Sequence, residues 1–264
     1  MSQSSEVQPA IEFRGVCYEL GSSRELLHNL SFRVLPGETL VLLGRSGSGK
    51  TTTLKLINVL LEPTAGEILV NGKPLREWDL IRLRRSIGYA IQEVGLFPHF
   101  TVARNIGLVP HIENWPADRI QKRVQELLRL VGLDEKLAMR YPRELSGGQR
   151  QRVGVARALA ADPPILLMDE PFGALDPITR VELQREFLAL QDRLKKTVVF
   201  VTHDLREALL LGTRIALIDG GKLAAMHTPR EFLRSLDPLV KAYVDAFGAE
   251  LRDHDNLTPN RGAS

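Results

Sequence analysis

The glycine-rich stretch Gly44-Arg-Ser-Gly-Ser-Gly-Lys50-Thr51 separates two segments of different character. Before it, Thr39–Leu43 is short and continuously apolar, which is typical of a strand covered on both faces. After it comes an apolar segment that we expect to be helical. A buried strand, a glycine-rich turn and a helix in this order predict an α/β core built around a parallel sheet.

The same stretch matches the pattern G-x-x-x-x-G-K-[ST], in which backbone N–H groups surround a polyphosphate. The following helix would present its positive end to that anion. Lys50 would reach the β- and γ-phosphates, and the Thr51 hydroxyl would bind Mg²⁺. A turn without a ligand is the alternative, and the flanking strand and helix argue against it. We therefore expect nucleotide binding by Gly44, Arg45, Ser46, Gly47, Ser48, Gly49, Lys50, Thr51 and Thr52.

A pair of carboxylates follows a second apolar strand, Ile165–Met168. Asp169 at the end of this strand is expected near the metal ion. Glu170 points elsewhere and could polarise the attacking water, a role worth about 10²–10⁴ in rate. Alone, such a pair would be a solvated strand end. In a chain that also carries a phosphate loop, we assign Asp169 to the metal and Glu170 to catalysis.

The rest of the chain alternates short apolar runs with amphipathic stretches. Apolar residues at helical spacing predict helices around 120–131 and 183–194. We expect a further strand at 198–201, antiparallel strands at 12–18 and 30–34, and a late hairpin of 215–218 with 222–226.

Composition excludes several classes of protein. The 264 residues carry 35 Lys and Arg against 32 Asp and Glu, and a net charge of +3 is too small to indicate nucleic-acid binding. The single Cys17 provides neither a disulfide framework nor a cysteine metal site. The longest stretch without a charged residue, Val94–Ala103, is far shorter than the roughly 20 residues of a membrane span. We expect a cytosolic chain with a disordered start (1–10) and a flexible tail (248–264).

Leu145-Ser-Gly-Gly-Gln149 changes the interpretation. By itself it is a helix start, with Ser146 as a good N-cap and two glycines that expose backbone N–H groups. Together with the two elements above, it resembles the signature of ATP-binding subunits of ATP-binding cassette transporters, over about residues 11–247. The resemblance implies a homodimer with ATP between the chains. The surface offered to the partner's γ-phosphate would consist of Ser146, Gly147, Gly148 and Gln149.

The resemblance also implies roles for three further residues. Gln92 would reach Mg²⁺ and the attacking water, and His203 would contact the γ-phosphate. Residues 174–176 match the loop that crosses the dimer interface, although a simple turn is the alternative. Adenine stacking is expected of Tyr18 or of aliphatic groups only, because Leu20 stands where many relatives have an aromatic residue. An ordinary half-buried strand residue is an equally good interpretation of Tyr18.

Within the family, the segment of about 93–162 would be an inserted α-helical subdomain that meets a membrane permease. The implied fold is therefore a P-loop NTPase core with an N-terminal antiparallel β subdomain and this insert. Phe97, Pro98 and Phe100 are the candidate residues for the permease contact. The chain would then be peripheral, on the cytoplasmic face of the membrane.

Four passages narrow the resemblance: 57–64, 87–99, 140–145 and 172–180 are similar to importer ATPases for glycine betaine, choline, carnitine or proline. The implied function is Mg²⁺-dependent ATP hydrolysis that powers import, with a solute-binding protein as an indirect partner. An importer for another small polar solute, such as an amino acid, is the first alternative. A soluble cassette ATPase of DNA repair or translation is the second. A small-molecule kinase would leave residues 145–149 unexplained.

Overall fold

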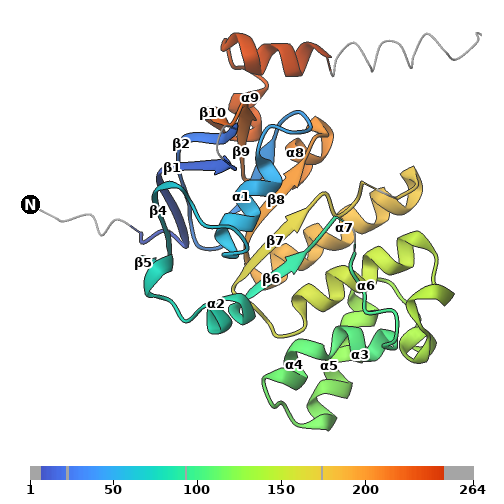
Figure 1. The fold of residues 1–264 in the computed structure, drawn as a ribbon. Helices are drawn as coiled ribbons and strands as arrows, with labels where there is room; N and C mark the ends of the chain where they lie inside the picture. The colour runs from blue at the N-terminus through green and yellow to red at the C-terminus, as the bar shows by residue number, and fades with distance from the viewer. Residues whose placement is uncertain (1–6, 22–23, 93, 174, 247–264) are drawn as a thin grey trace, which may run out of the picture.

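A mixed six-stranded sheet forms the centre of the computed structural model, which describes residues 7–21, 24–92, 94–173 and 175–246 (Figure 1). Its strand order is β10-β9-β3-β8-β7-β6. All neighbours are parallel except the β9–β10 hairpin. The strands are β3 (Thr39–Leu43), β6 (Ile87–Ala90), β7 (Ile165–Asp169), β8 (Thr197–Thr202), β9 (Arg214–Asp219) and β10 (Lys222–His227). The parallel core and the late hairpin are confirmed.

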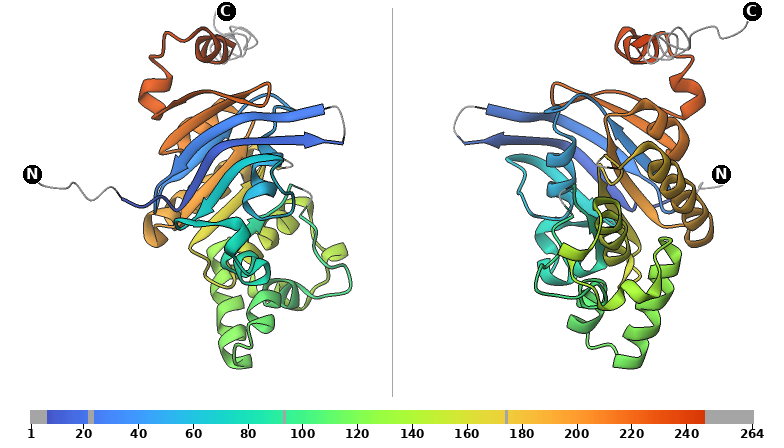
Figure 2. Two further views of the ribbon diagram at one scale, coloured as in Figure 1. Left: turned by 60° about the vertical axis from the view of Figure 1, so that its left-hand side comes forward. Right: turned by 90° about the vertical axis from the view of Figure 1, so that its right-hand side faces the viewer.

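A second, antiparallel sheet in the order β2-β1-β4-β5 covers one face of the first (Figure 2). It consists of β1 (Ile11–Leu20), β2 (Arg24–Val34), β4 (Ala65–Val70) and β5 (Lys73–Pro74). The antiparallel start of the chain is thus confirmed. However, β2 begins six residues before the predicted Leu30, because its first half pairs with the end of β1 in a ladder that includes Leu20↔Arg24 and Tyr18↔Leu27. Pairing with a neighbour, which local pattern does not report, extends the strand.

The helices fall into two groups. The first packs around the sheets: α1 (Lys50–Ile57), α2 (Leu80–Ser86), α7 (Pro177–Leu194), α8 (Leu205–Leu211) and α9 (Pro229–Phe232). The second forms a lobe beyond β6, visible in green in both views of Figure 2: α3 (Val102–Ile106), α4 (Leu108–Ile112), α5 (Ala117–Leu130) and α6 (Gly147–Leu159). Short 3₁₀ helices are η1 (Leu75–Glu77), η2 (Glu135–Met139) and η3 (Pro142–Glu144). The lobe lies within the predicted insert, whose bounds of 93 and 162 stay a prediction.

The side chains of β3 show why this strand reads as a continuous apolar run. Leu40 and Leu42 belong to the core shared with the antiparallel sheet, whereas Val41 and Leu43 belong to the core on the opposite side. Because successive side chains of a strand point to opposite faces, a strand covered on both faces must be apolar throughout. Its five residues are all buried, as predicted.

The carboxyl ends of three neighbouring strands bring distant motifs together. In the parallel ladder Leu43 lies opposite Thr202, and Asp169 lies opposite Val201. The loops that follow β3, β7 and β8 therefore leave the same edge of the sheet, which is where ligands bind in open α/β folds. No helix in the described ranges is long and apolar enough to cross a membrane. Of the expected disordered start and flexible tail, residues 1–6 and 248–264 lie outside the described residues.

Candidate nucleotide site

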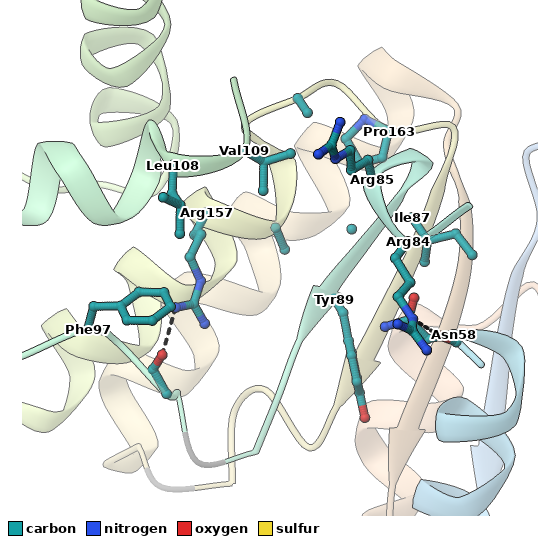
Figure 3. Close-up of a pocket in the computed structure, with 14 residues that line it drawn as sticks. Asn58, Arg84, Arg85, Ile87, Tyr89, Phe97, Leu108, Val109, Arg157 and Pro163 are labelled. Carbon is teal, nitrogen blue, oxygen red and sulfur yellow. Dashed lines mark hydrogen bonds between the residues drawn. The ribbon is translucent and has the colours of Figure 1, made fainter. Parts of the chain in front are cut away.

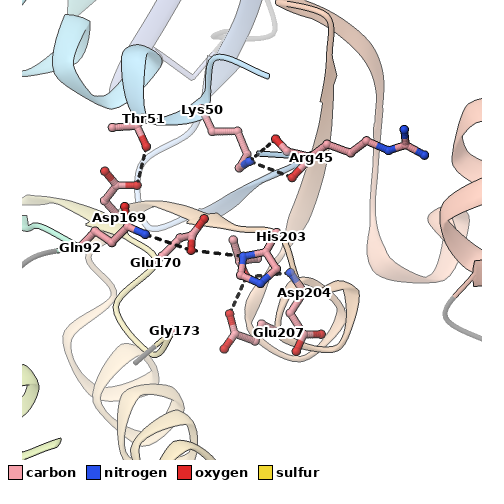
Figure 4. Close-up of polar contacts among 12 residues, drawn as sticks. Arg45, Lys50, Thr51, Gln92, Asp169, Glu170, Gly173, His203, Asp204 and Glu207 are labelled. Atoms are coloured by element: carbon pink, nitrogen blue, oxygen red, sulfur yellow. Dashed lines mark hydrogen bonds and ion pairs between the residues drawn. The ribbon is translucent and has the colours of Figure 1, made fainter. Parts of the chain in front are cut away.

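The loop between β3 and α1 is wrapped around the amine of Lys50. Its Nζ donates to the carbonyl oxygens of Gly44 and Arg45, each at 2.8 Å (Figure 4). Gly49 has a φ of 103°, a conformation that a residue with a Cβ rarely adopts. Burial is the main cause that lowers the pKa of Lys50, and the carboxylates of Glu170 and Asp169 oppose that shift. The loop thus holds a desolvated cation that an anionic group would stabilise.

Ser48 supplies a direct sign that the loop suits a phosphate. Its side chain is buried, and its Oγ has no hydrogen-bond partner within the described structure. A buried hydroxyl without a partner is costly, and a phosphate oxygen would satisfy it. Of the other loop residues assigned from sequence, Arg45, Ser46 and Gly47 are exposed and Thr52 is half-buried at the start of α1.

A hydroxyl and a carboxylate meet beside the loop, where Thr51 Oγ1 donates to Asp169 Oδ1 at 2.9 Å. Burial is the main cause that raises the pKa of Asp169, and the bond from Thr51 opposes it. Oxygen ligands of this kind suit Mg²⁺, which typically binds one or two carboxylates together with substrate phosphates. Within the described residues no group of three or more His, Cys, Asp or Glu side chains could hold a metal. A hydroxyl in contact with one carboxylate fits a metal shared with a polyphosphate.

Glu170 lies between two other predicted site residues. Its Oε2 accepts a hydrogen bond from Gln92 Nε2 at 3.4 Å and lies 3.2 Å from His203 Nδ1. These side chains follow β6, β7 and β8, so the strand order β8-β7-β6 explains the row seen in Figure 4. The carboxylate can hold a polar molecule such as water between an amide and an imidazole.

The backbone of Glu170 is strained, which sequence reasoning did not predict. Its φ of 44° lies in the left-handed region, which costs a non-glycine residue roughly 1–3 kcal/mol. Two hydrogen bonds hold it there: Glu170 N donates to Val201 O at 3.0 Å, and Gly173 N donates to Glu170 O at 3.1 Å. This turn directs the Glu170 side chain toward Gln92 and His203 (Figure 4).

The signature residues form the N-terminus of α6. Ser146 Oγ accepts from Gln149 N at 3.2 Å, and Gln149 Oε1 accepts from Ser146 N at 2.9 Å. This capping box confirms Ser146 as an N-cap. The helix begins at Gly147, directly after this cap. The helical lobe that contains α6 lies apart from α1 and the phosphate loop (Figures 1 and 2).

Tyr18 packs inward. Its side chain is 8% exposed within the core that includes Val16 and Leu27, whereas Leu20 on the same strand is 56% exposed. Adenine stacking by Tyr18 stays a prediction.

Arg157 is a neighbour of the site that sequence reasoning missed. From α6 its guanidinium donates to Val94 O at 2.6 Å and to Gly95 O at 2.7 Å, just beyond Gln92. Burial lowers the pKa of Arg157. The signal in the sequence is a single charge among buried residues of the helix, Val153-Gly-Val-Ala-Arg157-Ala-Leu159. A half-buried cation that binds two carbonyl groups fixes the path of the segment that follows Gln92.

Comparison with known proteins agrees with this geometry. The family profile described as "ABC transporter" matches residues 27–173. The chain belongs to the ABC transporter family. Among members of this family, it is 50% identical over 222 residues to the choline transport ATP-binding protein OpuBA of Bacillus subtilis, covering 84% of this chain and 58% of the relative. The glycine betaine uptake system ATP-binding protein YehX of Escherichia coli is 50% identical over 223 residues, which cover 84% of this chain and 72% of YehX.

Solved structures of the family support the fold. The dimeric structure of MJ0796, a bacterial ABC transporter cassette, superposes with a TM-score of 0.77 at 35% identity, covering 83% of this chain and 99% of that one. A dimeric post-hydrolysis state of the same cassette, bound to ADP and Pi, also has a TM-score of 0.77, at 34% identity. The chain spans little more than half the length of several curated ABC transporter relatives, 58% of OpuBA and 56% of the osmoprotectant import protein OsmV of Salmonella typhimurium.

Proposed function

We propose that this chain is the ATP-binding and ATP-hydrolysing subunit of an importer for osmoprotectants such as glycine betaine, choline, carnitine or proline. The observation that carries the ATPase assignment is the convergence of Lys50, Thr51, Asp169, Glu170 and His203 at one edge of the sheet. The solute class follows from relatives named for choline, glycine betaine and osmoprotectant transport, each about 50% identical.

In this proposal the site residues divide the work of binding phosphate, holding Mg²⁺ and activating water. Lys50 exchanges the carbonyl groups of Gly44 and Arg45 for phosphate oxygens. Thr51, Asp169 and Gln92 would hold Mg²⁺, which would supply positive charge against the phosphates. Glu170 accepts a proton from the attacking water, which the neighbouring Gln92 amide orients.

A second copy of the chain would complete the site. Ser146, Gly147, Gly148 and Gln149 stand at a capped helix N-terminus in the lobe, where exposed N–H groups suit an anion. Since they lie apart from the phosphate loop of their own chain, we propose that they contact the γ-phosphate held by the partner (Figures 1 and 2). Two solved structures of a related cassette are dimeric, which supports the pairing of two copies. His203 completes the shell from the chain that holds ATP.

A groove between the sheet edge and the helical lobe is the proposed permease contact (Figure 3). Its cavity of about 340 Å³ is lined by Tyr89, Phe97 and Val109 together with Arg84, Arg85 and Arg157. Phe97 is 41% exposed, so its ring is open to a partner. The three arginines lie beside it in the same groove. This chemistry suits a short permease helix with acidic residues. Attachment through this groove would make the chain peripheral on the cytoplasmic face of the membrane, with the solute-binding protein reached through the permease.

The test is ATP hydrolysis by the chain in complex with its permease. In proteoliposomes we expect hydrolysis to rise when glycine betaine, choline, carnitine or proline is supplied with the solute-binding protein. Lys50→Ala should abolish hydrolysis in every condition. Stimulation by an amino acid outside this class would overturn the solute assignment alone. An assembled complex that hydrolyses no ATP at all would overturn the enzymatic assignment.

A further inference from the structure

A buried carboxyl group lies directly behind His203. Glu207, on α8, is 5% exposed. Thr202 Oγ1 donates to its Oε2 at 2.6 Å, and Gln184 Nε2 donates to its Oε1 at 3.1 Å. Both carboxylate oxygens therefore have a partner, and neither partner belongs to the site described above.

Thr202 transmits this contact to His203. It immediately precedes the histidine, and its Oγ1 also accepts a hydrogen bond from Asp204 N at 3.0 Å. A hydroxyl can donate one hydrogen bond, and that of Thr202 donates to Glu207. The residues on both sides of His203 are thus held by one hydroxyl, whose direction Glu207 decides.

Gln184 connects the same carboxylate to α7. This helix begins at Pro177, with Asp176 as its N-cap, directly after the segment expected to cross the dimer interface. Arg180, one turn before Gln184, lies 3.9 Å from Asp204 across an ion pair. The loop that carries His203 is therefore held against α7 by two contacts.

Burying the carboxyl group of Glu207 costs free energy of folding. Burial is the main cause that raises the pKa of Glu207, and the charge of Asp204 raises it further. The bonds from Thr202 and Gln184 and the charge of Arg180 oppose the shift. An apolar side chain of similar size would avoid this penalty. A buried acid at this position therefore calls for a role beyond packing.

We propose that Glu207 is a positioning residue that, through Thr202, holds the His203 imidazole beside Glu170. The inference rests on the proposed ATPase function, in which His203 meets the γ-phosphate. The partners of the buried Glu207 carboxylate are Thr202 and Gln184, so its effect on the site passes through Thr202. The contribution of Glu207 is to place the imidazole of His203, a side chain that is 63% exposed.

The test compares Glu207→Leu with Glu207→Gln. Leucine removes both acceptor oxygens. Glutamine keeps one for Thr202, and the Gln184 amide can turn to meet the other end. For Glu207→Leu we expect kcat to fall about 10- to 100-fold, since a misplacement of about 1 Å can cost about a hundredfold in rate. The KM for ATP should stay unchanged, and Glu207→Gln should recover most of the lost kcat.

Two controls separate positioning from folding. Glu38→Leu removes a carboxylate that is 9% exposed and paired with Arg214 just before β3, at the opposite end of the sheet. It should lower thermal stability and leave kcat unchanged. In a His203→Ala background, Glu207→Leu should have no further effect on kcat. An equal loss in that background would overturn the proposal.

A readout independent of hydrolysis is the pair of ring ¹⁵N resonances of His203 in the nucleotide-free chain. They should move in Glu207→Leu. They should also move in Thr202→Val, a substitution that keeps the shape of the side chain and provides the test if the leucine variant fails to fold. They should stay in place in Glu38→Leu. Unmoved resonances in Thr202→Val and in a folded Glu207→Leu would overturn the positioning role. A wild-type chain without ATPase activity would overturn only the proposed function.

Discussion

Replacing Glu170 by glutamine gives the sharpest test of the proposed chemistry. In the Glu170→Gln variant the new amide oxygen can still accept from Gln92 Nε2 and meet His203 Nδ1, the contacts that the carboxylate makes at 3.4 and 3.2 Å. The backbone bonds to Val201 and Gly173 do not involve the side chain. The substitution therefore removes the ability to take a proton and leaves the local geometry in place.

The expected loss follows from that single change. General-base catalysis contributes about 10²–10⁴ in rate, which is about 3–5 kcal/mol at 1.36 kcal/mol per tenfold. We expect kcat to fall by this factor while the Kd for Mg²⁺-ATP changes less than about threefold, because Lys50 and Thr51 are untouched. Bound ATP would then persist and keep the dimer closed.

Single-turnover hydrolysis, ATP titration and light scattering with Mg²⁺-ATP measure these three quantities. Glu182→Gln is the matched control, since its carboxylate lies on α7, 3.3 Å from Arg152 and outside the row of site residues. It should hydrolyse ATP at the wild-type rate. A wild-type rate in Glu170→Gln would refute the assignment of the base. A parallel loss of ATP affinity would refute the claim that the geometry survives.

Three other substitutions test the site and its support. Asp169→Asn should raise the Tm of the nucleotide-free chain at pH 7 and abolish its stabilisation by Mg²⁺-ATP. Burial raises the pKa of Asp169, so the wild-type chain loses folding free energy as pH rises through that pKa, and asparagine recovers it. The gain in Tm should therefore vanish below pH 3.8, the ordinary pKa of the side chain. An unchanged Tm across pH would contradict this. Ser146→Ala should cost about 1 kcal/mol through loss of the N-cap bond to Gln149, with a fall in Tm of about 2–4 °C for a chain of this size. Its ATPase rate should fall more than that loss of stability explains, and equal ATPase would count against the signature role. The Phe200 ring lies in a buried cluster, with its centroid 5.7 Å from that of Phe172 and 6.2 Å from that of Phe187. Phe200→Ala should therefore lower the free energy of unfolding in urea by about 3–5 kcal/mol. A cost under about 1 kcal/mol would show that the cluster does not support β8.

Local features of the structure were predictable from sequence. The strand before the phosphate loop, the N-cap at Ser146 and the helices predicted around 120–131 and 183–194 depend on neighbours within a few residues. Apolar periodicity and turn chemistry act at that range. The length of β2 was underestimated because its first half is extended by pairing with the end of β1, which lies outside the local pattern.

The chain's own sequence thus determined which residues are suited to phosphate, metal and water, because motif, residue type and local pattern carry that chemistry. Tertiary structure alone decided that Thr51 bonds Asp169 across 118 residues of chain, since this requires the parallel strands β3, β8 and β7 to lie in that order in one sheet. It also decided the left-handed turn at Glu170 and the carboxyl of Glu207 behind His203. Such contacts are set by strand order and packing, which no local pattern encodes.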